Sequence, residues 1–72
     1  MAIDEKKQTA KEMFETLGWE QDKNNSNVIE YCRGFRSIVF LKYDKEVVPS
    51  CHLTMDWLKA INKQCEELGW IE

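Results

Sequence analysis

Two helix-stop signals constrain the fold of this chain more than any other feature. The tripeptide Leu-Gly-Trp occurs at residues 17–19 and again at residues 68–70, each time after a run with helical periodicity. Glycine can take the left-handed conformation that ends a helix, and the aromatic side chain after it can fold back on the last turn. The repeat therefore predicts two helices, with each tryptophan lying near the residue five positions before it, Phe14 or Cys65.

The first helix is expected over residues 4–17. Its apolar stripe has the spacing of one helical face and consists of Ala10, Met13, Phe14 and Leu17. Two residues compete as its N-cap: Asp4, and Thr9, which forms a capping box with Glu12 three residues later. We favour the earlier start at Asp4.

The second helix is expected to begin after Thr54. Threonine is a preferred N-cap residue, and Leu53 and Leu58 occupy the two positions of a hydrophobic staple. The predicted buried stripe consists of Leu58, Ile61, Cys65 and Leu68. Trp57, in the first turn, is expected at the edge of the core, with an exposed contact residue as the alternative.

Between the helices lie three runs rich in β-branched and aromatic residues, which predict strands. The runs are residues 28–33, 35–43 and 46–52. Gly34 separates the first two, and Asp44-Lys45 is short enough for a tight hairpin between the second and third. Pro49 has no N–H to donate to a ladder, so the third strand belongs at an edge. Residues 21–27, which are polar and rich in asparagine, are expected to form a solvated connection.

These elements predict an α+β fold with the order α-β-β-β-α. We expect a single small domain over residues 1–72, with a three-stranded antiparallel sheet in the order 1-2-3 and two helices packed mainly on one face. Alternation in the middle strand puts Ile38 and Phe40 on one face, while the opposite face is also apolar. Because two helices cover one face, we expect a homo-oligomer, a dimer or larger, with Ile38 and Phe40 as its surface. The alternative, one helix on each face, needs no partner.

Composition disfavours several partners and settings. The 13 acidic and 10 basic residues give a net charge of −3, which argues against duplex DNA as a partner. The longest apolar run, residues 38–41, is too short to span a bilayer, so no membrane association is expected. The odd number of cysteines and the lack of an apolar signal stretch favour a reduced, cytoplasmic setting.

The sequence gives little support for a catalytic or metal-binding site. Cys51 and His52 are adjacent zinc-type ligands, but neighbours on a strand point to opposite faces and no second ligand pair completes a tetrahedral site. Glu12 and Glu15 can face the same way, yet a hydrated helix surface accounts for them better than acid–base catalysis. We therefore expect a protein that is not an enzyme and that needs neither a metal nor a cofactor.

The best candidate contact site surrounds Arg33 and Arg36, the two arginines of the chain. They flank Gly34 at the end of the first hairpin, and Tyr31 and Tyr43 lie on the neighbouring strands. Guanidinium groups near aromatic rings suit phosphates, nucleotides or a partner's carboxylates, and both residue types are enriched in protein interfaces. The alternative is a pair of exposed arginines at a turn, with no role in binding.

Three segments of the chain resemble a known group of proteins. The segments are residues 9–19, 53–56 and 60–70, the last running from Ala-Ile-Asn-Lys-Gln to Leu-Gly-Trp. They are similar to small uncharacterised proteins encoded by phages and prophages of Gram-positive bacteria. No catalytic motif comes with this resemblance, so it assigns no functional residue.

The resemblance implies a non-enzymatic phage accessory protein of the binding type. We expect a counter-defence factor that binds a host immune protein or sequesters a nucleotide-type signal. Two alternatives stay open. One is a structural or regulatory interaction module that acts on phage proteins, and the other is a small-molecule or metal site assembled between subunits.

Overall fold

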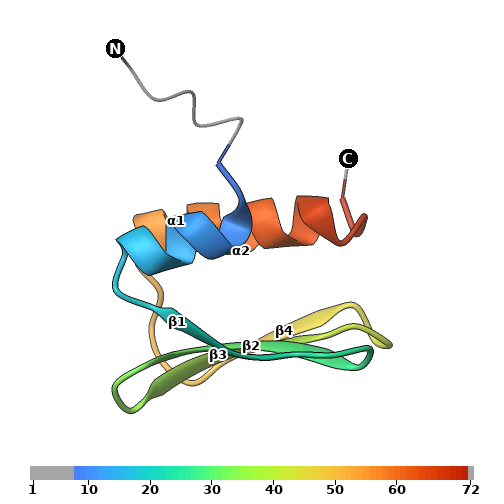
Figure 1. Cartoon of the computed structure of the whole chain (residues 1–72), viewed down its shortest axis with the longest axis horizontal. Helices are drawn as coiled ribbons and strands as arrows, with labels where there is room; N and C mark the ends of the chain where they lie inside the picture. Colours follow the sequence, from blue (N-terminus) through green and yellow to red (C-terminus); the bar gives the residue numbers. More distant parts are fainter. Residues whose placement is uncertain (1–7, 72) are drawn as a thin grey trace.

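Two helices lie side by side on one face of a four-stranded antiparallel sheet (Figure 1). The structure, a computed structural model, describes residues 8–71. Its elements are α1 (Ala10–Thr16), β1 (Glu20–Asn24), β2 (Val28–Arg33), β3 (Arg36–Leu41), β4 (Glu46–Pro49) and α2 (Met55–Glu67). The strands pair in sequence order, β1-β2-β3-β4. The predicted α+β class and the packing of both helices on one face are therefore confirmed.

The prediction of three strands is wrong, because Glu20–Asn24 forms a fourth strand where a solvated connection was expected. Four of the five β1 side chains are exposed, so the segment lacks the apolar alternation by which strands are recognised. Its strand geometry comes from pairing with β2, where Gln21 stands opposite Tyr31. A bulge between Gln21 and Lys23 interrupts the register.

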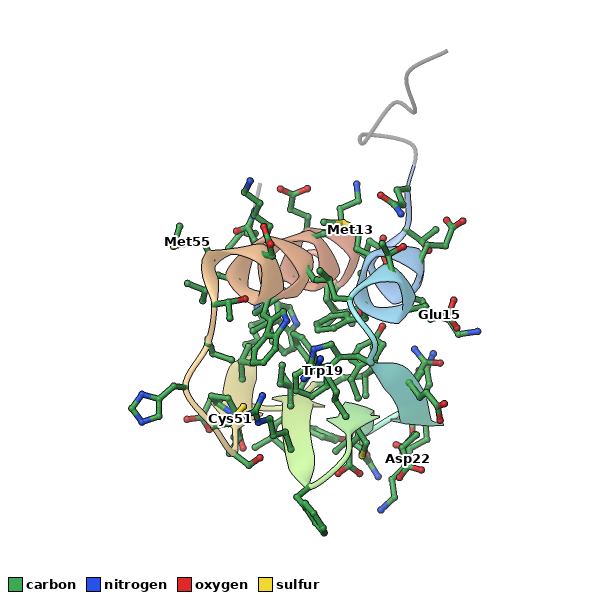
Figure 2. The ribbon with its side chains drawn as sticks, turned by 90° about the vertical axis from the view of Figure 1, so that its left-hand side faces the viewer. Met13, Glu15, Trp19, Asp22, Cys51 and Met55 are labelled. Atoms are coloured by element: carbon green, nitrogen blue, oxygen red, sulfur yellow. The ribbon has the colours of Figure 1, made fainter. Side chains whose placement is uncertain are left out.

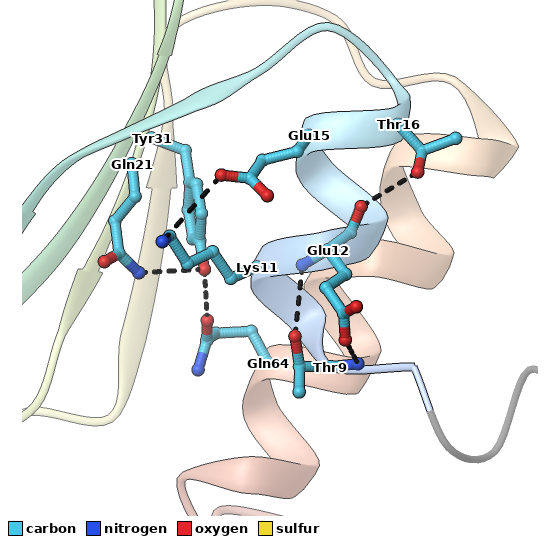
Figure 3. A network of polar contacts seen from close by, with 8 residues as sticks. All are labelled: Thr9, Lys11, Glu12, Glu15, Thr16, Gln21, Tyr31 and Gln64. Atoms are coloured by element: carbon cyan, nitrogen blue, oxygen red, sulfur yellow. Dashed lines mark hydrogen bonds and ion pairs between the residues drawn. The ribbon is translucent and has the colours of Figure 1, made fainter.

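Side-chain caps define where both helices begin. Thr9 is extended, with φ −77° and ψ 161°, and its hydroxyl accepts from the backbone N–H of Glu12 at 3.1 Å. The Glu12 carboxylate accepts in turn from the Thr9 N–H, which completes the capping box (Figure 3). The favoured start at Asp4 is thus wrong for α1, and Asp4 itself lies outside the described residues. Thr54 caps α2 as predicted.

The two Leu-Gly-Trp sequences end the helices as predicted. Gly18 and Gly69 have φ values of +91° and +77°, in the left-handed region. The Trp19 N–H donates to the Phe14 carbonyl at 2.9 Å, and the two rings meet edge to face. The Trp70 N–H donates to the carbonyl of Cys65 at 3.0 Å. Both are the six-to-one bond of a Schellman motif, so the glycine stop also carries each tryptophan toward the core.

The aromatic core lies between the helices and the sheet. Its largest fully buried side chains are Trp19, Tyr31, Phe14, Phe40 and Ile38. Phe14 of α1 stacks on Tyr31 of β2, with ring centroids 3.9 Å apart. Ile38 and Phe40 are 0% exposed beneath the helices, so their assignment to an oligomer surface is wrong. The two helices cover the face that carries them, and the open face carries Val39 and Leu41 instead.

A buried hydrogen-bond chain crosses this core. The Tyr31 hydroxyl donates to the Gln64 side-chain oxygen of α2 at 2.7 Å and accepts from the Gln21 amide of β1 at 3.2 Å (Figure 3). Gln64 is only 5% exposed, so its amide is removed from water. These hydrogen bonds join β1, β2 and α2 at the hydroxyl oxygen of Tyr31.

The buried face of α2 differs in part from the predicted stripe. Ile61 is buried as predicted, and Cys65 and Leu68 pack partly buried against the core. The buried residues of α2 are Trp57, Ala60, Ile61 and Gln64. Leu58, which was expected inside, is 41% exposed. The helix is rotated relative to the apolar pattern because Gln64 turns inward to accept from Tyr31 and Trp57 turns inward to meet Trp19.

Replacing Tyr31 with phenylalanine should lower the free energy of unfolding by about 1–3 kcal/mol, because the buried Gln64 oxygen loses its donor. Urea denaturation measures this change. The double variant Tyr31→Phe with Gln64→Leu is the control, since removing both polar partners should cost less than removing one. A Tyr31→Phe variant as stable as the wild type would contradict the role of the hydrogen bond.

Stability should also fall at alkaline pH. Burial raises the pKa of Tyr31 above 10.0 and that of the Cys65 thiol above 9.0. Both groups hold their protons more tightly in the folded protein than in the unfolded one. Their contribution to the free energy of unfolding is therefore complete below about pH 9 and is lost as the pH rises further. Urea denaturation between pH 7 and about pH 11 should show this decline, and Tyr31→Phe should make it shallower. Equal declines would contradict the assignment.

Candidate functional site

The tip of the hairpin between β2 and β3 carries an exposed phenylalanine, Phe35, which lies between two arginines in the sequence. Arg33 and Arg36 are directly opposite each other in the ladder, and Gly34 and Phe35 make the two-residue turn between them. Gly34 has φ +63°, while Phe35 has no positive φ, which is the pattern of a type II′ turn. The Phe35 side chain is 108% exposed, so it makes essentially no contact with its own domain.

Both arginines lie over the same tryptophan. The guanidinium carbons of Arg33 and Arg36 are 5.5 Å and 5.6 Å from the ring centroid of Trp57, within cation–π range. Trp57 itself is 9% exposed and meets Trp19 edge to face at 5.2 Å. Trp19 points into the layer between helices and sheet, so the platform beneath the arginines is anchored in the core (Figure 2).

Gly18 makes room for one of these arginines. A Cβ atom added at Gly18 would lie 3.0 Å from Nε of Arg33, closer than ordinary van der Waals contact. The absence of a side chain therefore lets Arg33 pass over the end of α1 on its way to Trp57. Gly18 therefore both ends α1 and leaves the space that Arg33 needs to reach Trp57.

The charge of this pair is not neutralised locally. Like charges directly opposite on a ladder repel each other, and contact with Trp57 offsets part of that repulsion. Across residues 8–71 the ion pairs are Lys11–Glu15 and Lys23–Glu30, so no carboxylate of that part of the chain pairs with either guanidinium. Both arginines are exposed and can accept an anionic group from outside.

The predicted contact residues do not form one site. Arg33 and Arg36 come together as expected, but Tyr31 is 0% exposed and its hydroxyl is engaged inside the core. Tyr43 is 88% exposed at the other end of β3, about 20 Å along the strand from Arg36. Sequence reasoning missed Phe35, which it placed as an ordinary strand residue. The signal was its position directly after Gly34 in a two-residue turn.

One group of metal-type ligands lies on the open face of the sheet. Asp22, Glu30 and Cys32 each offer a ligand atom, and these atoms lie within 4.8 Å of one another. Glu30 already pairs with Lys23 at 3.9 Å. Burial, followed by the charges of Glu30 and Asp22, raises the pKa of Cys32, so its thiol is protonated at neutral pH. A cation would have to displace Lys23 and a proton, and we assign no metal to this group.

Three surface hollows of the described chain lie away from the hairpin tip. One is between the helices near Met13 and Asp56, one runs along α2 from Met55 to Ile71, and one is at the turn around Tyr43. The hairpin tip lines none of them. It is a projecting surface, which suits insertion into a partner rather than enclosure of a small molecule.

Comparison with known proteins identifies no relative: no family model, no curated protein and no solved structure matches the chain. Within residues 8–71, neither helix has the length and apolar character needed to cross a bilayer.

The substitution Gly18→Ala should lower the free energy of unfolding by about 1–2 kcal/mol or more, because the residue has a positive φ and its new Cβ would meet Arg33. In an Arg33→Ala background the same substitution should cost less. Gly69→Ala is the matched control, since its φ is also positive but its Cβ would have no neighbour within 4 Å. Thermal or urea denaturation of Gly18→Ala, Arg33→Ala, their double variant and Gly69→Ala measures these changes. If the Gly18→Ala and Arg33→Ala effects are additive, Arg33 does not lie against Gly18.

Proposed function

We propose that this chain is a non-enzymatic binding protein that docks on a partner protein through the tip of the β2–β3 hairpin. The observation that carries the proposal is Phe35, fully exposed in the turn that joins Arg33 and Arg36, whose guanidinium groups lie over Trp57. An aromatic residue and two arginines in one hairpin turn have the composition of an interface hot spot. We name Arg33, Phe35 and Arg36 together the hairpin tip.

The chemistry of the hairpin tip specifies the kind of surface it fits. Burying the Phe35 side chain is worth about 1.5–3 kcal/mol, which requires an apolar pocket on the partner. The two guanidinium forks suit carboxylates at the rim of that pocket, where bidentate pairing fixes orientation. The rigid two-residue turn and the Trp57 platform reduce the entropy lost when these side chains bind.

A protein partner is favoured over a nucleotide by the burial of the tryptophan. Trp57 is 9% exposed beneath the arginines, so its ring is not available for a base to stack on. The hollows described above also lie elsewhere on the surface. Phosphate could still pair with the guanidinium groups, but that contact would leave Phe35 in water.

The biological setting of the proposal comes from the resemblance of residues 9–19 and 60–70 to phage and prophage proteins. We place the chain among phage accessory proteins and propose a host protein as the partner, with counter-defence as the role. A module that acts on the phage's own proteins would use the same hairpin tip. The partner recovered in the experiment below distinguishes the two.

The experiment is affinity capture from lysates of a Gram-positive host, with and without phage infection, followed by quantitative mass spectrometry. The bait is the wild-type chain, and Phe35→Ala and the double variant Arg33→Glu with Arg36→Glu are the test variants. A specific partner should be retained by the wild type and reduced about 10-fold or more by each test variant. Circular dichroism should show that the folds are unchanged, because these side chains are exposed.

Tyr43→Ala is the matched control, because Tyr43 is an exposed aromatic residue at the opposite hairpin. It should capture the partner as well as the wild type does. Equal capture by all the variants would exclude the hairpin tip as the docking surface. A nucleotide that co-purifies with the wild type and is lost only in the arginine variant would favour sequestration of a small molecule instead.

A further inference from the structure

One flank of α2 gathers half of the large apolar side chains that the described chain exposes. Among residues 8–71 these side chains are Phe35, Tyr43, Val48, Met55, Leu58 and Ile71. The last three, at 70%, 41% and 42% exposure, line one continuous hollow along the helix. Met55 lies at the start of α2 and points away from the core (Figure 2). A concentration of this kind marks an interaction surface, whereas single exposed apolar residues are ordinary.

The flank follows a regular helical stripe. Met55, Leu58, Asn62 and Cys65 are spaced by three, four and three residues, which places them above one another on one side of α2. Ile71 adds to the same hollow from beyond the helix end. We define these five residues as the α2 flank. It borders the buried face of the helix, because buried Ile61 also lines the hollow and Cys65 packs partly against the core.

We propose that the α2 flank packs against the α2 flank of a second copy of this chain, with the two helices antiparallel and Asn62 at the two-fold axis. In this arrangement residues whose numbers add to about 124 face each other across the axis. Leu58 then lies against the region of Cys65 in the second copy, and Met55 against the segment before Ile71. Every contact occurs twice, as an isologous dimer requires.

Charge complementarity favours a second copy of the chain as the partner and an antiparallel arrangement of the two α2 helices. Lys59 lines the hollow and Glu66 lies seven residues later on the same side of the helix, so both border the flank. In the antiparallel pair each Lys59 faces Glu66 of the other copy, which gives two pairs of opposite charges. In a parallel pair the edge that carries Lys59 and Glu66 lies on opposite sides of the interface in the two copies, so these charges do not meet. The flank is therefore complementary to itself in the antiparallel direction only.

The open face of the sheet is the competing surface for self-association. Among the described strand residues of this face, Val28, Val39 and Leu41 are half-buried by their neighbours and Val48, at 48%, is largely exposed. The α2 flank exposes three large apolar side chains, whereas the strands of the open face expose one. Dimerisation through the α2 flank therefore removes more apolar surface from water than dimerisation through these strands. The inference does not depend on the hairpin tip, which is formed by other elements.

Sedimentation equilibrium tests the proposal at concentrations up to about 500 µM, a range that detects weak dimers. The wild type should approach twice the chain mass of 8.6 kDa. Leu58→Glu should remain a monomer throughout, because it places a carboxylate inside the interface, one helical turn from the two-fold axis. Val48→Glu is the matched control on the open sheet face and should dimerise like the wild type. Both side chains are exposed, and circular dichroism checks that both variants fold.

A charge exchange tests the antiparallel direction. Lys59→Glu should raise the dimer dissociation constant by about 10-fold or more, because it sets like charges together. The double variant Lys59→Glu with Glu66→Lys should return it to within a few-fold of the wild type. A wild type that stays monomeric, or a dimer dissolved by Val48→Glu but not by Leu58→Glu, would overturn the proposal. Dissociation by Leu58→Glu without rescue by the charge exchange would overturn the antiparallel arrangement.

Discussion

The packing around Tyr31 is the interaction on which the rest of this structure depends. Its ring lies face to face with Phe14 of α1, with centroids 3.9 Å apart, and its hydroxyl bonds to Gln64 of α2 and Gln21 of β1. One side chain of β2 thus touches both helices and the edge strand. In a domain of this size, where a single core supplies little surplus stability, such a junction sets the relative placement of all the layers.

The placement of α2 then determines the candidate binding surface. With Gln64 bonded to Tyr31, the first turn of α2 brings Trp57 against Trp19 and beneath the arginines of the hairpin tip. The same orientation leaves Leu58 in solvent. The covered face of the helix therefore builds a base for the hairpin tip, and the α2 flank is the surface that we propose for a second copy. A dimer of this kind would present two hairpin tips, which raises avidity for a partner that offers two sites.

Much of the fold could be predicted from local chemistry. The two Leu-Gly-Trp stops, the cap at Thr54 and the strand Val28–Arg33 depend on residues close together in the sequence, and each is present in the structure. The cap at Thr9 was recognised as an alternative, although Asp4 was favoured. Arg33 and Arg36 were also placed together, because a two-residue turn forces neighbours of this kind into register. Trp57 could not be assigned to them, since it lies on an element that arrives more than twenty residues later.

By itself the sequence determined the two helices with their C-terminal stops, the strands β2, β3 and β4 and the edge position of the strand that contains Pro49, because propensities, caps and proline act within a few residues. Only the tertiary structure decided the strand character of Glu20–Asn24, the burial of Ile38 and Phe40 and the rotation of α2. A polar segment becomes a strand when a neighbour supplies its hydrogen bonds, and an apolar strand face becomes core when helices cover it. A glutamine enters the core when a buried hydroxyl is there to bond it.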